Sequence, residues 1–279
     1  METSLFFKTF VVFGSQLSLV FGICYYFIYR VRKATLAGEP FLGAVFEKQY
    51  NKNGELDLFS PEEQAYDKWV TKETAELDAL FYKDRAAYKK RKKELEEEME
   101  EKRPPLSKLL TNLIVCWTIA LFATLFISGS DFSILIKMLV LSIASMSFGP
   151  ILGAIMISMD ENDGLRILNL TVAITFLTAI IGIFSGIDFS SLGYILIVPL
   201  FMLVIWNLLN IFINFTSASR RIMGIFGSFI FIGYLLFDFY RLEQASANGI
   251  NDWNTAFNIG FSIYLDVINL LLELLEAMG

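Results

Sequence analysis

Long apolar runs separated by short polar segments dominate this sequence of 279 residues. A helix of roughly 20 apolar residues crosses the hydrocarbon core of a bilayer, which is about 30 Å thick. Seven runs are long enough to do so, at Leu5–Tyr29, Leu109–Ile127, Phe132–Ser158, Ile167–Ile187, Leu192–Phe215, Ile222–Tyr240 and Thr255–Leu275. The pattern predicts an all-α polytopic membrane protein built as a bundle of seven transmembrane helices.

The same pattern divides the chain into three parts. Residues 1–29 form the first transmembrane helix, residues 30–107 a polar insertion, and residues 108–279 the other six helices. The first run differs from a cleaved signal peptide, because it ends in aromatic residues, has no small-residue cleavage site and is followed at once by a basic cluster. We interpret it as a retained membrane anchor.

The insertion has an irregular first half and a helical second half. Residues 34–59 contain glycine, proline and asparagine residues typical of turns. Ser60 and Glu63 then form a capping box, which opens a helix over about residues 61–103. Pro104-Pro105 ends this helix, because proline cannot continue the helical hydrogen bonds. We therefore expect one long soluble helix beyond the membrane.

The role of this helix stays open among three interpretations. Phe81, Tyr88 and Leu95 recur at seven-residue spacing, but polar residues interrupt the second seam position that a coiled coil needs. A solvated spacer, or an arm that docks a protein partner, is favoured. The basic block at residues 89–93 could instead contact anionic lipid, although the acidic residues that follow it weaken such a contact.

Composition and charge narrow the function. The chain is 55% hydrophobic and 19% charged, which is too apolar for a soluble enzyme. Its net charge of −6 argues against nucleic-acid binding. The sequence has no histidine, which excludes histidine metal sites and histidine proton chemistry. Cys24 and Cys116 lie far apart in apolar runs, so neither a zinc site nor a disulfide framework is predicted, and no cofactor is expected.

Basic residues indicate how the chain is oriented in the membrane. Of the 23 Lys and Arg residues, 16 lie in residues 30–103, and Arg166 and Arg220-Arg221 lie in loops on the same side. The other side carries Lys8 and Arg241. Because basic flanks stay in the cytosol, we place the insertion and the C-terminus there and the N-terminus outside. The host membrane is a bacterial plasma membrane or the endoplasmic reticulum.

The last apolar run carries a continuous polar face. Its polar residues follow steps of four, four, three and four and therefore lie on one side of a helix. They are Asn258, Ser262, Asp266, Asn269 and Glu273. A polar stripe gains nothing from contact with lipid, so this helix is expected at the centre of the bundle.

Asp238, near the end of the sixth run, is a second aspartate within a span. An ionised aspartate at mid-membrane costs about 2.5–3.5 kcal/mol, which favours a functional role for Asp238 and Asp266. If the two carboxyl groups meet, they share one proton and titrate as a unit, and they are hard ligands suited to Ca²⁺. Asp266 lies deeper from the outer side than Asp238, so they meet only if the sixth helix continues toward Asn248 or the spans are staggered.

Four motifs resemble one known family. Residues 262–271 read Ser-Ile-Tyr-Leu-Asp-Val-Ile-Asn-Leu-Leu, and residues 233–238 read Gly-Tyr-Leu-Leu-Phe-Asp. Supporting matches are Ser147-Phe148-Gly149-Pro150 and Phe6-Phe7-Lys8-Thr9-Phe10. Together these motifs resemble the last-helix signature and other membrane segments of the Bax inhibitor-1 family. The resemblance covers the spans but not the insertion.

The resemblance implies a seven-helix fold with the last helix central, and a pH-dependent calcium leak governed by two aspartates, here Asp238 and Asp266. Two departures stand out: Phe237 replaces the usual tyrosine, and the second span has no arginine, where some relatives place a basic partner for the sixth-helix aspartate. Lys137 is our candidate counter-ion for Asp238. Alternatively, its amine extends to the membrane interface.

The expected partners of the protein are the lipid bilayer, Ca²⁺ and protons. Three functions are considered. We favour a pH-sensitive calcium leak gated by the Asp238–Asp266 pair. The supporting residues of its path are Asn258, Ser262, Asn269, Glu273 and Lys137. The alternative is a non-conducting scaffold that modulates a membrane protease or a cell-death or stress partner through the helix over residues 60–103. Bulky residues flank both aspartates, which disfavours an intramembrane aspartyl protease, so no enzyme activity is expected.

Overall fold

The computed structural model describes residues 4–52, 54–130, 132–212 and 216–278. In these parts of the chain seven helical segments are long and apolar enough to cross a membrane, which confirms the prediction of seven spans. They are α1 (Leu5–Ala37), α4 (Pro105–Ser128), α5 (Ile134–Met159), α6 (Glu161–Phe184), α7 (Leu192–Ile195) with α8 (Ile197–Phe212), α9 (Ser217–Ala247) and α10 (Trp253–Met278).

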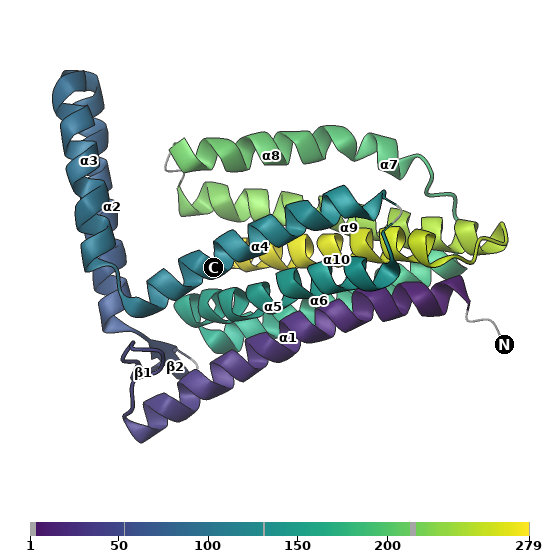
Figure 1. Cartoon of the computed structure of the whole chain (residues 1–279), viewed down its shortest axis with the longest axis horizontal. Coiled ribbons are helices and arrows are strands. Elements are labelled where there is room, and N and C mark those ends of the chain that lie inside the picture. Colours follow the sequence, from purple (N-terminus) through teal and green to yellow (C-terminus); the bar gives the residue numbers. More distant parts are fainter. Residues whose placement is uncertain (1–3, 53, 131, 213–215, 279) are drawn as a thin grey trace.

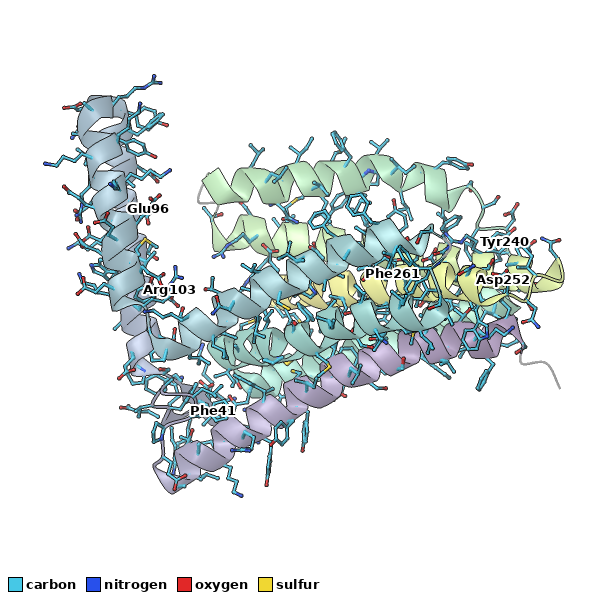
Figure 2. The ribbon with its side chains drawn as sticks, in the orientation of Figure 1. Phe41, Glu96, Arg103, Tyr240, Asp252 and Phe261 are labelled. Atoms are coloured by element: carbon cyan, nitrogen blue, oxygen red, sulfur yellow. The ribbon has the colours of Figure 1, made fainter. Side chains whose placement is uncertain are left out.

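The spans run side by side and alternate in direction (Figure 1). The start of α1 and the α9–α10 connection lie at one end of the bundle. The insertion, the α5–α6 junction and the end of α10 lie at the other, which we call the insertion end. Figure 2 places Tyr240 and Asp252 together at the end opposite to the insertion. The last helix therefore runs the whole length of the bundle.

The last helix occupies the centre, as its polar stripe predicted. Helix α10 packs against α1, α4, α5, α6 and α9. Its apolar residues, such as Ile263, Leu270 and Leu271, are completely buried. Helix α8, in contrast, lies at the outside of the bundle beside α9 (Figure 1).

Glycines allow several spans to approach each other closely, as is common between helices in membranes. A Cβ atom at Gly149 of α5 would lie 2.7 Å from Ile23 Cβ of α1, and one at Gly182 of α6 would lie 2.7 Å from Phe239 Cβ of α9. Gly149 belongs to one of the motifs noted above, so at least part of that motif is explained by helix packing.

The first half of the insertion contains a small sheet that the sequence did not predict. Strands β1 (Glu47–Tyr50) and β2 (Leu56–Phe59) pair antiparallel, with Glu47 opposite Phe59. In the link between the strands the N–H group of Gly54 donates a hydrogen bond to the carbonyl oxygen of Asn51 at 3.0 Å, and Gly54 adopts a positive φ of 75°. This β-hairpin lies against the bundle at the insertion end (Figure 1).

The expectation of one helix over residues 61–103 was wrong, although the segment is helical. Two antiparallel helices, α2 (Pro61–Lys83) and α3 (Arg85–Lys102), form a helical hairpin that stands across the direction of the spans (Figure 1). Asp84 adopts an extended conformation between them, and its Oδ1 accepts hydrogen bonds from the N–H groups of Ala86 and Ala87. Arg91 joins the helices through Glu73, at 2.6 Å.

Replacing Asp84 by alanine is expected to loosen the start of α3 by about 1 kcal/mol, the usual value of an N-cap side chain. Amide hydrogen exchange at Ala86 and Ala87 should then quicken about fivefold, because 1 kcal/mol changes an opening equilibrium by that factor. Asp78→Ala, at an exposed position of α2, serves as the control. Equal exchange rates in both variants would contradict a capping role.

Candidate functional site

The carboxyl groups of Asp238 and Asp266 lie within hydrogen-bonding distance of each other. They meet because α9 continues to Ala247, well beyond the apolar run that ends at Tyr240. Asp266 lies midway along α10, and Asp238 is 3% exposed. Asp238 Oδ2 is buried and accepts no hydrogen bond from an N–H or O–H group in the described residues. A proton shared with Asp266 would satisfy this oxygen.

One cation balances the two carboxyl groups in part. Arg241 Nη1 lies 3.5 Å from Asp238 Oδ1, three residues further along α9. Tyr234, one turn before Asp238, is close enough to both aspartates to interact with their charges. Arg241 was known from the sequence as a flanking residue, and its i,i+3 spacing from Asp238 could have identified it as the partner.

Lys137 is not the counter-ion of Asp238, which corrects the prediction. Its side chain is completely buried, and Nζ donates hydrogen bonds to the carbonyl oxygen of Ser128 at 2.9 Å and to Asn254 Oδ1 at 3.0 Å. The physical reason is its place in the first turn of α5, beside the end of α4, where free carbonyl groups attract a cation. Because the side chain is buried among α4, α5 and α10, its amine does not extend into solvent.

The other polar residues of α10 line one face but have different environments. Asn258, Ser262 and Asn269 are half-buried along the face that carries Asp266. Glu273 is buried, with its carboxylate against Gly227 of α9. The structure thus keeps the predicted stripe together, and Asp266 is the member whose carboxyl group contacts Asp238. Amide, hydroxyl and carboxylate oxygens in this order are ligands that suit a hard cation.

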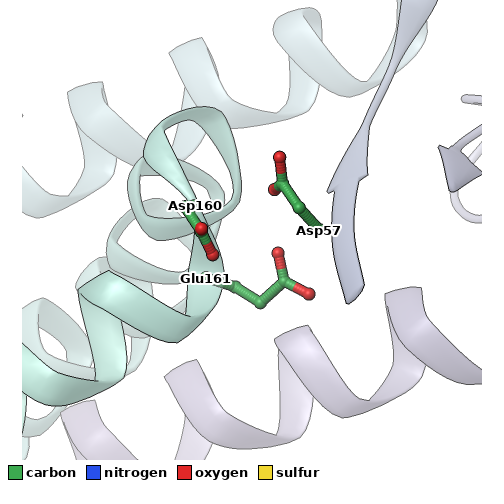
Figure 3. A group of neighbouring side chains, drawn as sticks. All are labelled: Asp57, Asp160 and Glu161. Carbon is green, nitrogen blue, oxygen red and sulfur yellow. The ribbon is translucent and has the colours of Figure 1, made fainter. Parts of the chain in front are cut away.

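A second group of carboxylates, Asp57, Asp160 and Glu161, lies at the insertion end (Figure 3). One oxygen from each lies within 4.8 Å of the others. All three side chains are at least nine-tenths buried. Sequence reasoning missed this group, because Asp57 comes from β2 and the other two from the α5–α6 junction, and no periodic pattern connects them.

Asp160 connects the β-hairpin to the bundle. Its Oδ2 accepts a hydrogen bond from Asn51 Nδ2 at 2.7 Å, and its Oδ1 accepts from the N–H group of Asn162 at 2.9 Å. Burial alone would raise the pKa of Asp160, but these hydrogen bonds outweigh it and hold the pKa below its usual value. Asp160 is therefore ionised at neutral pH.

The carboxylates of Glu161 and Asp57 also accept hydrogen bonds from other residues of the protein. Glu161 Oε1 lies 3.1 Å from Arg32 Nη2, and Oε2 accepts from the N–H group of Leu58 at 3.1 Å. Asp57 Oδ2 accepts a hydrogen bond from Gln49 Nε2. These bonds hold β2, α1 and α6 together, so the group has a structural role that needs no metal.

Residues 98–279 match the family model described as "Inhibitor of apoptosis-promoting Bax1". This match includes both aspartates and all the spans except α1. The chain belongs to this family. The motifs around Asp238 and Asp266 had indicated the same Bax inhibitor-1 family, while residues 1–97, which contain α1, the β-hairpin and most of the helical hairpin, lie outside the match.

Individual Bax inhibitor-1 relatives are similar over a shorter stretch. The chain is 32% identical to "Bax inhibitor 1" of Schizosaccharomyces pombe over 92 residues, and 35% identical to "Protein LIFEGUARD 4" of Arabidopsis thaliana over 91 residues. It is 31% identical to the "Golgi anti-apoptotic protein" of Vaccinia virus (strain Lister) over 97 residues. These stretches cover 33% of this chain and 33%, 35% and 36% of the respective relatives. The chain thus spans about a third of the length of the curated relatives it matches.

Proposed function

We propose that this protein is a pH-sensitive calcium leak in which the Asp238–Asp266 pair forms the cation site. The observation that carries the proposal is the direct approach of two carboxyl groups on adjacent, membrane-spanning helices, with Arg241 at 3.5 Å from one of them. Such an arrangement is costly for packing alone, because asparagine would fill the same space without a charge. Family membership supports the proposal as well.

The proposed mechanism depends on how many protons the carboxyl groups of Asp238 and Asp266 bind. With one shared proton, the carboxyl groups are joined by a hydrogen bond and hold α9 against α10. When the proton leaves, two like charges repel each other and become ligands for Ca²⁺. The half-buried residues Asn258, Ser262 and Asn269 extend the polar face along α10 with their side-chain oxygens. Flux should therefore rise with pH, and Arg241 competes with the cation for Asp238.

The biological setting is part of the proposal. The names of two relatives, an anti-apoptotic protein and a Bax inhibitor, support a role as a membrane modulator of cell death or stress. We place the insertion end in the cytosol, because 16 of the 23 basic residues lie in residues 30–103. The host membrane is a bacterial plasma membrane or the endoplasmic reticulum, and no enzyme reaction is assigned.

A second candidate function is a non-conducting scaffold. It is favoured by the α2–α3 hairpin, which projects from the bundle (Figure 1). Tyr82, the second-last residue of α2, is 88% exposed. In this case the hairpin would dock a membrane protease or a cell-death partner. The aspartate pair would then serve only to join α9 to α10.

Calcium influx into liposomes that contain the purified protein tests the leak. Between about pH 6 and 8, where a coupled carboxyl pair titrates, wild-type flux should rise with pH. Asp238→Asn and Asp266→Asn should each lower the flux at pH 8 at least about fivefold, because loss of one unit charge beside a bound cation costs at least about 1 kcal/mol.

Two further variants separate the leak from the scaffold. Asp78→Asn removes an exposed carboxylate of α2 and should leave the flux unchanged. Replacement of residues 68–98 by a short Gly-Ser linker should also leave it unchanged. If folded wild-type protein shows no more flux than empty liposomes, the leak is wrong, and loss of partner binding on removal of the hairpin would support the scaffold.

A further inference from the structure

A cavity of about 400 Å³ lies at the insertion end, between β2 and the start of α2 on one side and α4 and α5 on the other. Its volume is in the range of small-molecule sites. The β2 and α2 side is acidic, with Asp57, Glu63 and Asp67, and the α4 and α5 side is apolar, with residues such as Leu110 and Ile155. The cavity belongs neither to the aspartate pair nor to any role given above.

The acidic side has little positive charge to balance it. All residues that line the cavity are described, and none of them is lysine or arginine. Asp57 has Asp160 and Glu161 directly behind it, and Arg32 is the cation that contacts this group. Arg32 balances the charge of Glu161, whereas hydrogen bonds hold Asp57 and Asp160 in place without an ion pair to either of them in the described residues.

Glu63 has a similar environment on the other side of the opening. It is half-buried, and its Oε1 accepts a hydrogen bond from the N–H group of Ser107 at 3.2 Å. Burial raises the pKa of Glu63, and the nearby carboxylates of Asp67 and Glu62 add to the shift, which the bond from Ser107 opposes. A cation held beside Glu63 would relieve both effects.

The cavity changes from polar to apolar along the membrane normal. Leu110, Ile114, Ile151 and Ile155 belong to the insertion-end halves of two spans, whereas the three lining carboxylates lie outside the spans. A molecule with one apolar chain and a charged head fits this polarity. The lining favours a cationic head, because carboxylates attract a positive charge, whereas a phosphate or sulfate would meet carboxylates without a basic side chain to bind it.

We infer that this cavity binds a single-chain amphiphile with a primary ammonium head. The ammonium group lies between Asp57 and Glu63, where its three N–H donors find carboxylate oxygens, and the chain lies between α4 and α5 against Leu110 and Ile155. A long-chain amine in the cytosolic leaflet would reach this site by lateral movement from the bilayer.

Native mass spectrometry of the full-length protein in detergent tests the inference with defined probes. Dodecylammonium should give a saturable one-to-one adduct. Dodecyl sulfate, which has the chain with an anionic head, and ethylammonium, which has the head without the chain, should give none at the same concentration. Equal adducts with all three, or no adduct with dodecylammonium, would overturn the inference.

Variants locate the bound amine. Asp57→Asn with Glu63→Gln should weaken dodecylammonium binding by at least about tenfold, because two attractive charges are lost. Ala154→Trp, which fills the apolar part, should abolish it. Asp67 is exposed, so Asp67→Asn is expected to fold normally and to weaken binding severalfold even if the buried variants misfold on size-exclusion chromatography. Asp78→Asn is the charge-matched control, and equal affinity in Asp67→Asn and Asp78→Asn would place the amine elsewhere.

Discussion

Alanine at Gly149 is expected to lower the free energy of unfolding by about 2 kcal/mol, the usual cost of overpacking a tight contact. Its Cβ would lie 2.7 Å from Ile23 Cβ and 3.0 Å from the carbonyl oxygen of Val20. The second atom is backbone and cannot rotate away, so α5 and α1 must separate. Unfolding of the purified protein in mixed micelles with increasing dodecyl sulfate measures the change.

Gly14→Ala is the matched control for this prediction. Gly14 lies inside α1, and apart from its own stretch of helix no heavy atom of the described residues lies within 4 Å of the position that its Cβ would occupy. Alanine should stabilise the protein there by about 0.5–1 kcal/mol, because glycine is the poorer helix former. A change of the same sign in both variants would show that close approach of the helices is not what Gly149 provides.

Arg32→Ala is expected to cost about 2 kcal/mol of stability. It leaves Glu161, whose side chain is completely buried, without its cation. Loss of one partner of a fully buried ion pair costs about 3–5 kcal/mol, and the 36% exposure of the Arg32 side chain reduces this value. Thermal unfolding of the detergent-solubilised protein, followed by circular dichroism, gives the change in stability.

A double-mutant cycle separates the contribution of the Arg32–Glu161 ion pair from that of the packing of the Arg32 side chain. Glu161→Gln in the Arg32→Ala background should recover at least half of the lost stability, because the uncompensated buried charge is removed. Arg32→Lys retains the charge and should cost less than alanine. If Glu161→Gln brings no recovery, Arg32 acts through the packing of its side chain and not through the ion pair.

The spans could be predicted from the sequence because seven apolar runs have no other favourable arrangement in water or lipid. The contact between Asp238 and Asp266 could be stated only as a condition. Helix α9 continues through polar residues as far as Ala247, and hydropathy does not report where a polar helical extension ends. The condition was correct, and the structure fulfils it.

The predictions of a single insertion helix and of Lys137 as a counter-ion were wrong for a different reason. The segment around Asp84 contains no glycine or proline, so the sequence shows no break in one helix, whereas a single capping side chain and the pair between Arg91 and Glu73 favour a hairpin. The pairing of Lys137 with Ser128 and Asn254 depends on how α4, α5 and α10 pack. Contacts between distant segments of this kind leave no periodic signal in the sequence.

Hydrogen bonds attach the base of the α2–α3 hairpin to two helices of the bundle, α4 and α6. Glu63 accepts a hydrogen bond from Ser107 at the start of α4, and Leu58, just before α2, donates one to Glu161 at the start of α6. The hairpin is therefore a lever that is supported by α4 and α6. A force applied at its tip would be transmitted first to α4 and α6, and it would reach the aspartate pair through the packing of α6 on α9 and α10.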